Sequence, residues 1–240
     1  MKGNGWRLTL AVVTAIAVVI AVRVMCVALI SIPTDGHAPT LLAGDRLIMG
    51  RWAYGLRKPW SRSGDRWGSQ WAQVGQWLVY NSPSTQTILQ PASGAVCVGL
   101  CIAAPGDTLW VCQKGHVSRL HTRGSQQRAM VLPSRGEYVD IEPWSAPVYA
   151  RIITSYERLE AKAENGHLVI GGRHIGRFRF GHDYYWTYSG TSTDLRDSRT
   201  MGFVPHEMLM GRIRCVLYSI DAQSNWLHAW RWERCLKAVE

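Results

Sequence analysis

The chain opens with one long apolar run. Residues Leu8–Val22 are apolar except for two threonines, and the apolar character resumes on the far side of Arg23. A helix needs roughly 20 residues to cross the hydrocarbon core of a bilayer. The pattern therefore predicts one transmembrane helix from Trp6 to about Met25, with the Arg23 side chain reaching toward the membrane surface.

A cleaved signal peptide is the alternative interpretation of this run. Arg23 directly follows the apolar residues and no clear small-x-small cleavage site comes after it, so an uncleaved anchor is favoured. Lys2 and Arg7 precede the run, and by the positive-inside rule they place the N-terminus in the cytoplasm. The rest of the chain is then expected outside the inner membrane.

Beyond the apolar run, hydrophobic residues recur in short β-branched or alternating stretches bounded by Gly, Pro, Asn and Ser, which predicts mostly β structure. Val148–Glu160 has the pattern of a helix, and Trp226–Val239 is a second candidate. The predicted strands are Arg46–Gly50, Trp77–Tyr80, Val96–Ile102, Thr108–Cys112, His167–Ile170 and Arg212–Ile220.

These elements predict a single antiparallel β domain with an insertion. A polar stretch from Gln113 to Arg135 interrupts the β pattern and marks the start of an inserted cap subdomain. Residues 1–25 form the N-terminus and anchor, 26–112 and 183–225 the β core, 113–182 the cap and 226–240 a C-terminal tail.

The amino-acid composition indicates that the protein contacts a membrane surface. The 240 residues carry a net charge of +10 and contain 12 Trp against 3 Phe. A strongly basic net charge favours binding to nucleic acid or to an anionic membrane. The lysines and arginines are scattered and no nucleic-acid motif is present, so nucleic acid is not an expected partner. Tryptophan suits the lipid interface, where its ring lies in lipid and its N–H among the headgroups.

Between positions 51 and 77, tryptophans are interleaved with arginines and a lysine, and we call this the Trp/Arg segment. We expect it to rest on the outer leaflet, with indoles inserted and basic groups on phosphates. Trp77 is the exception, because it lies in a predicted strand and is expected in the core. The tryptophans of the segment are Trp52, Trp60, Trp67, Trp71 and Trp77.

Three blocks of sequence occur in a distinctive order. The first block, Ile32–Arg57, contains Pro-Thr-Asp-Gly-His-Ala-Pro-Thr-Leu, followed by Gly-Asp and Tyr-Gly. The second block, Val98–Asp107, ends in Pro-Gly-Asp. The third block, Asp197–Pro205, reads Asp-Ser-Arg-Thr-Met-Gly-Phe-Val-Pro. Together they resemble the bacterial type I signal peptidases over nearly the whole chain. The resemblance implies a signal-peptidase-like β fold with a cap, anchored in the bacterial inner (cytoplasmic) membrane by a single pass, its main domain extracytoplasmic.

The resemblance also implies a catalytic pair that is missing here. In that family a serine attacks the peptide carbonyl, and a neutral lysine with a pKa lowered by burial acts as the general base. The nucleophile position falls on Gly36 and the base position on Gly99. Glycine has no side chain that fills either role, so we predict that the family's hydrolysis is absent.

The supporting positions differ as well. The serine that orients the base is replaced by Leu195, and two bracing positions are Gly190 and Ser192. Thr34 matches the additional oxyanion hydroxyl. The remaining family residues are interpreted as groove and structural positions that hold turns and strands together. They are Pro39, Asp107, Asp197, Ser198 and Arg199.

Asp35 and His37 flank Gly36 and form a conceivable replacement dyad. Neighbouring residues in an extended segment point to opposite sides, so neither inherits the direction of the lost side chain. His37 is interpreted as a surface or groove histidine rather than a catalyst.

The cysteines give no metal site and no fixed disulfide pattern. Six cysteines allow many pairings in an oxidising compartment. Cys97 and Cys101 lie too far apart on a straight strand to pair with each other. There is no Cys-x-x-Cys and no paired histidine cluster, so no metal and no cofactor are expected.

Three functions follow from these observations. The leading hypothesis is a catalytically inactive homologue, a pseudoenzyme that binds signal peptides or a secretion or processing partner in the former substrate groove, because strand addition depends on main-chain hydrogen bonds rather than on a nucleophile. One alternative is an active membrane peptidase that cleaves preproteins with an unrecognised nucleophile, such as Thr34 or a groove cysteine. The other is a structural subunit of a membrane complex.

Overall fold

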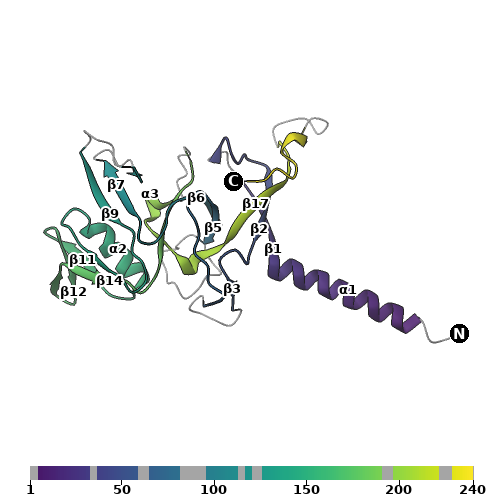
Figure 1. The fold of residues 1–240 in the computed structure, drawn as a ribbon, viewed down its shortest axis with the longest axis horizontal. Coiled ribbons are helices and arrows are strands. Elements are labelled where there is room, and N and C mark those ends of the chain that lie inside the picture. The colour runs from purple at the N-terminus through teal and green to yellow at the C-terminus, as the bar shows by residue number, and fades with distance from the viewer. Residues whose placement is uncertain are drawn as a thin grey trace.

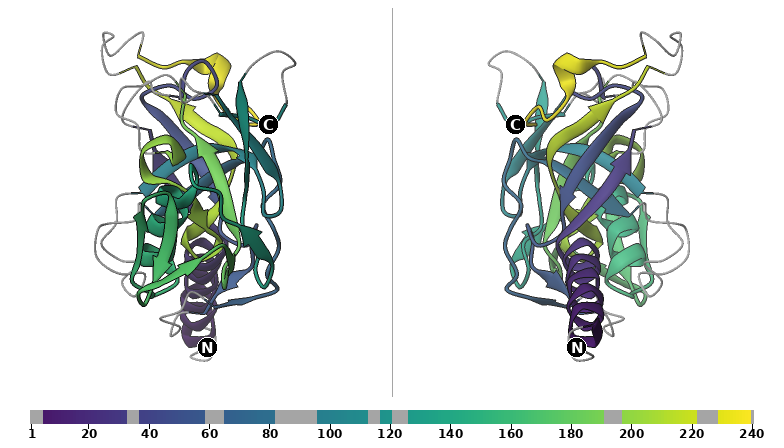
Figure 2. Two further views of the ribbon diagram at one scale, coloured as in Figure 1. Left: turned by 90° about the vertical axis from the view of Figure 1, so that its left-hand side faces the viewer. Right: turned by 90° about the vertical axis from the view of Figure 1, so that its right-hand side faces the viewer.

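The structure is a computed structural model that describes residues 5–32, 37–58, 65–81, 96–112, 117–120, 126–190, 197–221 and 229–239. One helix, α1 (Gly5–Cys26), projects from a body built mostly of antiparallel strands (Figure 1). The two side views show the helix leaving the body at one end, with the N-terminus farthest from it (Figure 2).

A seven-stranded antiparallel sheet forms the part of the body next to α1, with the strand order β1-β2-β17-β5-β6-β15-β16. Its central strand β5 is buried on both faces, because Trp77 and Val79 pack into one core while Leu78 and Tyr80 pack into a second. The strands are β1 (Val27–Ser31), β2 (Asp45–Gly50), β5 (Trp77–Asn81), β6 (Val96–Ala103), β15 (Tyr184–Tyr188), β16 (Val204–Pro205) and β17 (Leu209–Ser219).

The end of the body opposite α1 consists of smaller sheets and the helix α2 (Ala146–Tyr156) (Figure 1). One face of α2 is buried in a third core, which reaches Ala103, Trp186 and Phe203 at the end of the main sheet. The smaller sheets are β8-β7-β9 (Val117–Ser118, Thr108–Cys112, Gln127–Val131), β10-β14 (Tyr138–Asp140, Arg177–Arg179) and β11-β12-β13 (Ala161–Glu164, His167–Ile170, Arg173–Ile175).

Short elements complete the described chain. A hairpin of β3 (Leu56–Arg57) and β4 (Arg66–Trp67) lies between β2 and β5 in sequence. The remaining elements are α3 (Ser198–Met201) and the 3-10 turns η2 (His206–Met208) and η3 (Trp232–Arg234).

The predicted elements agree with the observed ones at most positions. All six predicted strands are present, and the helix predicted at Val148–Glu160 is α2. The helix suggested for Trp226–Val239 is wrong within the described residues 229–239, where β-bridges to Ile220 and Cys215 flank the turn η3.

The structure corrects the prediction of a transmembrane helix. In α1, which has 22 residues, the side chains from Trp6 to Val19 are exposed. Within the part of the chain that the structure describes, no helix has both the length and the apolar character required to cross a membrane.

A buried ion pair ties the C-terminal segment to β2. The Asp45 carboxylate is fully buried, and it accepts from Arg234 Nη2 at 2.6 Å, from Arg234 Nε at 3.2 Å and from the Leu42 N–H at 2.9 Å. Burial opposes ionisation of Asp45, but the hydrogen bonds from Arg234 and Leu42 outweigh it and hold the pKa below its ordinary value.

Replacing Arg234 by alanine is expected to cost about 3 kcal/mol of unfolding free energy, because it leaves a buried carboxylate unpaired. The matched control is Arg177→Ala, which breaks an exposed pair with Asp140 and is expected to change stability by less than about 1 kcal/mol. Urea denaturation measures both variants, and equal losses would contradict the assignment.

The same pair predicts a pH dependence. Since the Asp45 pKa is lowered in the folded state, its contribution is complete above the ordinary aspartate pKa of about 3.9 and is lost as pH falls further. We expect Asp45→Asn to flatten the decline of stability between about pH 4 and pH 2. An unchanged slope in that variant would show that other carboxylates cause the decline.

Candidate functional site

Gly99, the position that the resemblance assigns to the base, lies in the middle of β6. Leu78 of β5 is its cross-strand partner. A Cβ built on Gly99 would lie 3.1 Å from Thr187 Cβ and 3.3 Å from Tyr80 Oη. Both distances are shorter than ordinary van der Waals contact, so Thr187 and Tyr80 occupy the space next to this glycine.

Three hydroxyl groups form a chain of hydrogen bonds beside Gly99. Thr187 Oγ1 donates to Tyr80 Oη at 3.0 Å and lies 3.2 Å from Ser198 Oγ. Ser198 Oγ accepts the Thr187 N–H at 2.8 Å. All three side chains are buried, and we call them the hydroxyl network. No local sequence pattern predicts this network, because Tyr80 and Thr187 are 107 residues apart.

Asp197, the residue before Ser198, holds this network in place. Its buried carboxylate accepts the Ser189 N–H at 3.0 Å, the Ser189 hydroxyl at 3.1 Å and the Arg199 N–H at 3.0 Å. Arg199 Nη2 completes an ion pair at 2.8 Å. Burial opposes ionisation of Asp197, but the bonds from Arg199 and Ser189 outweigh it and keep the pKa low. Asp197 is therefore a fixed anion that positions its neighbours.

Arg199 links this anchor to the preceding turn. Its Nη2 donates to the Gly190 carbonyl at 2.6 Å, and its guanidinium lies 4.4 Å from the centre of the Tyr188 ring. Gly190 thus contributes a backbone oxygen at a position where the resemblance implies a bracing carboxylate.

His37 lies against β6 beside Gly99. Its Nε2 is 2.8 Å from the Val98 carbonyl oxygen, and its ring centre is 5.7 Å from that of Trp77. A carbonyl only accepts, so Nε2 carries the proton in this contact. Nδ1 is buried and has no hydrogen-bond partner among the described residues. Burial lowers the pKa of His37, which favours the neutral ring.

Several positions singled out in the sequence lie outside the described residues. They are Thr34, Asp35, Gly36, Ser192 and Leu195, and also Trp60 of the Trp/Arg segment. Gly36, at the nucleophile position, lies outside the described residues, so the described site contains the base position Gly99 but not the nucleophile position.

Pro39 and Asp107 lie in turns. Pro39 is exposed and follows a cis peptide bond. Asp107 Oδ2 accepts the Ala104 N–H at 2.9 Å, closing the turn that includes Pro105 and Gly106, and pairs with Arg119 at 3.3 Å.

All six cysteines are free thiols. Cys101 lies on β6 two residues after Gly99 and is fully buried. Burial raises the pKa of the Cys101 thiol to about 12, so it stays protonated at neutral pH. A protonated, buried thiol is a poor nucleophile, which argues against Cys101 as the unrecognised nucleophile of an active peptidase.

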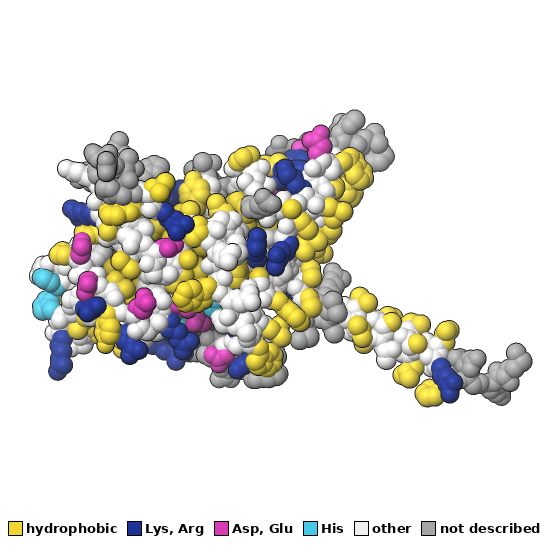
Figure 3. All heavy atoms as spheres, viewed as in Figure 1, with side chains coloured by type: hydrophobic (Ala, Val, Ile, Leu, Met, Phe, Trp, Pro, Cys, Tyr) yellow, Lys and Arg dark blue, Asp and Glu magenta, His cyan; other side chains and the backbone are white. Residues whose placement is uncertain are grey.

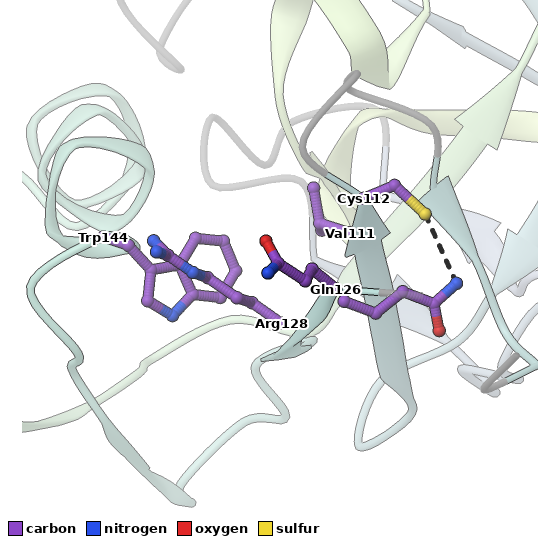
Figure 4. Close-up of a pocket in the computed structure, with 6 residues that line it drawn as sticks. Val111, Cys112, Gln126, Arg128 and Trp144 are labelled. Carbon is purple, nitrogen blue, oxygen red and sulfur yellow. Dashed lines mark hydrogen bonds between the residues drawn. The ribbon is translucent and has the colours of Figure 1, made fainter. Parts of the chain in front are cut away.

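A separate pocket of about 560 Å³ lies beside strands β7 and β9 (Figure 4). Arg128 stacks over Trp144 with its guanidinium carbon 5.9 Å from the ring centre, and Gln127 Nε2 donates to Cys112 Sγ at 3.3 Å. Val111 and Gln126 complete the lining. The pocket includes none of the positions that the resemblance assigns to catalysis.

Comparison with known proteins gives one family. The model of the family described as signal peptidase, peptidase S26, matches residues 5–218, which include all three sequence blocks, the hydroxyl network and Asp197. No individual curated protein matches the chain. Since the match extends over most of the sequence, the chain belongs to the signal peptidase family, peptidase S26.

Proposed function

We propose that this protein is a catalytically inactive member of its family that binds an extended peptide, a signal peptide or a segment of a secretion or processing partner, through the former substrate groove. The observation that carries the proposal is the filled space at Gly99, where Thr187 and Tyr80 lie against the position assigned to the base. A general base needs a side chain at that point and room for it.

The hydroxyl network does not replace the missing base. Burial raises the pKa of Tyr80 well above neutrality, so this phenol keeps its proton. Thr187 and Ser198 already satisfy each other and the backbone. Among the three atoms nearest to a Cβ at Gly99, none belongs to a lysine. These groups are suited to hold β5, β15 and α3 together rather than to remove a proton.

The middle of β6 offers main-chain groups to a peptide. The ladder to β15 covers Leu100–Ala103, whereas Val98 and Gly99 are paired only with β5 among the described strands. His37 occupies the Val98 carbonyl from outside that ladder. An added strand would take this carbonyl in place of the imidazole, and peptides commonly bind by extending a sheet in this way.

We further propose that α1 attaches the protein to a lipid bilayer. The side chains from Trp6 to Val19 are predominantly apolar and are all exposed, and Figure 3 shows apolar side chains along the face of the helix turned to the viewer. A helix that is apolar on every side is stable in a nonpolar environment. Exposed indoles of the Trp/Arg segment, with Trp52 at 56%, Trp67 at 47% and Trp71 at 57%, are suited to the lipid interface, whereas Trp77 is buried as expected.

The principal test is incubation of the purified protein with a preprotein that carries an Ala-x-Ala cleavage site. We expect binding without cleavage. Cleavage by the unmodified protein would overturn the proposal, and absence of both binding and cleavage would favour a purely structural subunit. The Gly36→Ser/Gly99→Lys variant is expected to remain inactive, because the lysine stem meets Thr187 and Tyr80.

Packing around Gly99 predicts a stability effect. Gly99→Ala is expected to lower the unfolding free energy by about 1–3 kcal/mol through overpacking. Gly176→Ala is the matched control, since a Cβ there meets nothing within 4 Å, and it is expected to be neutral or slightly stabilising. A neutral Gly99→Ala in urea denaturation would show that the space is open.

Membrane attachment is tested by flotation of the full-length chain with anionic liposomes. Val12→Gln/Ile16→Gln/Val19→Gln in α1 is expected to reduce the floated fraction by at least about tenfold, because three apolar side chains no longer enter the lipid. Leu120→Gln, which changes a highly exposed leucine of the body, is the control and should leave flotation unchanged. Equal flotation of the two variants would exclude α1 as the attachment.

A further inference from the structure

A serine and a histidine meet at a second place in the fold, outside the hydroxyl network. Ser69 Oγ lies 3.1 Å from His206 Nε2. Ser69 is exposed on the segment that follows β4, whereas His206, the first residue of η2, is only 7% exposed. A Cβ on the preceding Gly68 would meet nothing within 4 Å, so the turn next to Ser69 is open to an incoming molecule.

A third group orients the imidazole from the other side. His206 Nδ1 lies 3.2 Å from Tyr185 Oη, and that hydroxyl also accepts the Ala72 N–H at 3.2 Å. Tyr185 is fully buried in β15, so its position is fixed by packing. The roles of the two ring nitrogens depend on the tautomer. In the tautomer with the proton on Nδ1, the Tyr185 oxygen accepts both the Ala72 and the Nδ1 protons, and Nε2 is an acceptor facing Ser69. A Ser69–His206 pair depends on this tautomer.

The charges around His206 keep the ring neutral. Burial lowers its pKa, and the Arg66 guanidinium lowers it further, while Glu207 and Asp183 act in the opposite direction. Arg66 is held beside the ring by donating to the backbone oxygens of His206, Gly55 and Leu209. A neutral imidazole next to a fixed cation is suited to accept a proton and to stabilise a developing negative charge.

We propose that Ser69 and His206 form a nucleophile–base pair that accepts an acyl group from an apolar ester. The apolar class follows from Trp67 and Trp71, which flank Ser69 by two residues on each side and are about half exposed. An ester is the fitting donor because its alcohol leaves more readily than the amine of a peptide.

Each step conserves atoms and charge. Ser69 Oγ bonds to the ester carbonyl carbon while its proton passes to His206 Nε2, which gives a tetrahedral oxyanion. The carbon–alkoxide bond then breaks, and the leaving alcohol takes the proton from Nε2, which leaves an acyl-serine. Water attacks the acyl-serine by the same route, releases the carboxylic acid and restores the Ser69 hydroxyl. Tyr185 acts as a positioning residue through His206.

This site is independent of the proposed peptide groove. Tyr185 and Thr187 lie on the same strand, but neither Ser69 nor His206 belongs to the hydroxyl network. Loss of acyl transfer at Ser69 therefore leaves peptide binding intact, and failure of peptide binding does not affect the proposal for Ser69.

The test is labelling of the detergent-solubilised full-length chain with a fluorophosphonate–rhodamine probe, read by gel fluorescence and by mass spectrometry of the Ser69 peptide. The Ser69 oxygen displaces fluoride from phosphorus. We expect Ser69→Ala to abolish the adduct, His206→Ala to slow labelling about 100-fold, and Ser118→Ala to change nothing. Because Ser69 is exposed, Ser69→Ala leaves the core intact and gives a decision even where His206→Ala fails to fold.

Three further readouts separate a catalytic pair from a structural hydrogen bond. Labelling is expected to rise with pH to a plateau, with its midpoint below the ordinary histidine pKa of 6.5. Tyr185→Phe, which keeps the ring but loses the hydroxyl, should slow labelling and change this profile. p-Nitrophenyl octanoate should be hydrolysed faster than the acetate. Absence of a Ser69 adduct, equal labelling of Ser69→Ala, or a 15N NMR spectrum that places the His206 proton on Nε2 at neutral pH would overturn the proposal.

Discussion

The buried carboxylate of Asp197 is the interaction on which the arrangement around β6 depends. It is held as an anion by Arg199 and by the Ser189 N–H, and so it fixes the start of α3. Ser198 follows directly, and its hydroxyl accepts the Thr187 N–H, which sets Thr187 against Gly99. The Asp-Ser-Arg run, one of the blocks that resemble the family, thus supports packed hydroxyl groups here.

Local pattern was enough to predict the strands but not their partners. Val96–Ala103 is recognisable because bulky β-branched residues alternate with small ones, and Thr108–Cys112 and His167–Ile170 were predicted at their observed bounds. The segment after position 226 was ambiguous, since its tryptophans and arginines fit a helix face equally well. Its bridges to Cys215 and Ile220 are tertiary contacts that no local pattern encodes.

Some residues of the candidate site could be assigned from sequence motifs, whereas others are brought together only by the fold. The resemblance assigned Gly99 and the Asp-Ser-Arg run from motif spacing, and these assignments stay predictions. Tyr80, Thr187, Ser69 and His206 carry no motif, and their proximity arises only when β5, β6 and β15 pair and when β4 approaches η2. His37 was interpreted as a surface or groove histidine, and its bond to the Val98 carbonyl joins residues 61 positions apart, which no local pattern encodes.

The pair of Asp45 and Arg234 affects the order in which the chain folds during synthesis. Its two members are 189 residues apart, and β2 also pairs with β17 from the far end of the sequence. Strands made early during synthesis therefore wait for the last residues before their buried polar groups are satisfied. Contacts of such high sequence separation slow folding and leave sheet edges exposed in the meantime. Until the C-terminal segment has emerged, the edge of β2 that pairs with β17 lacks this partner.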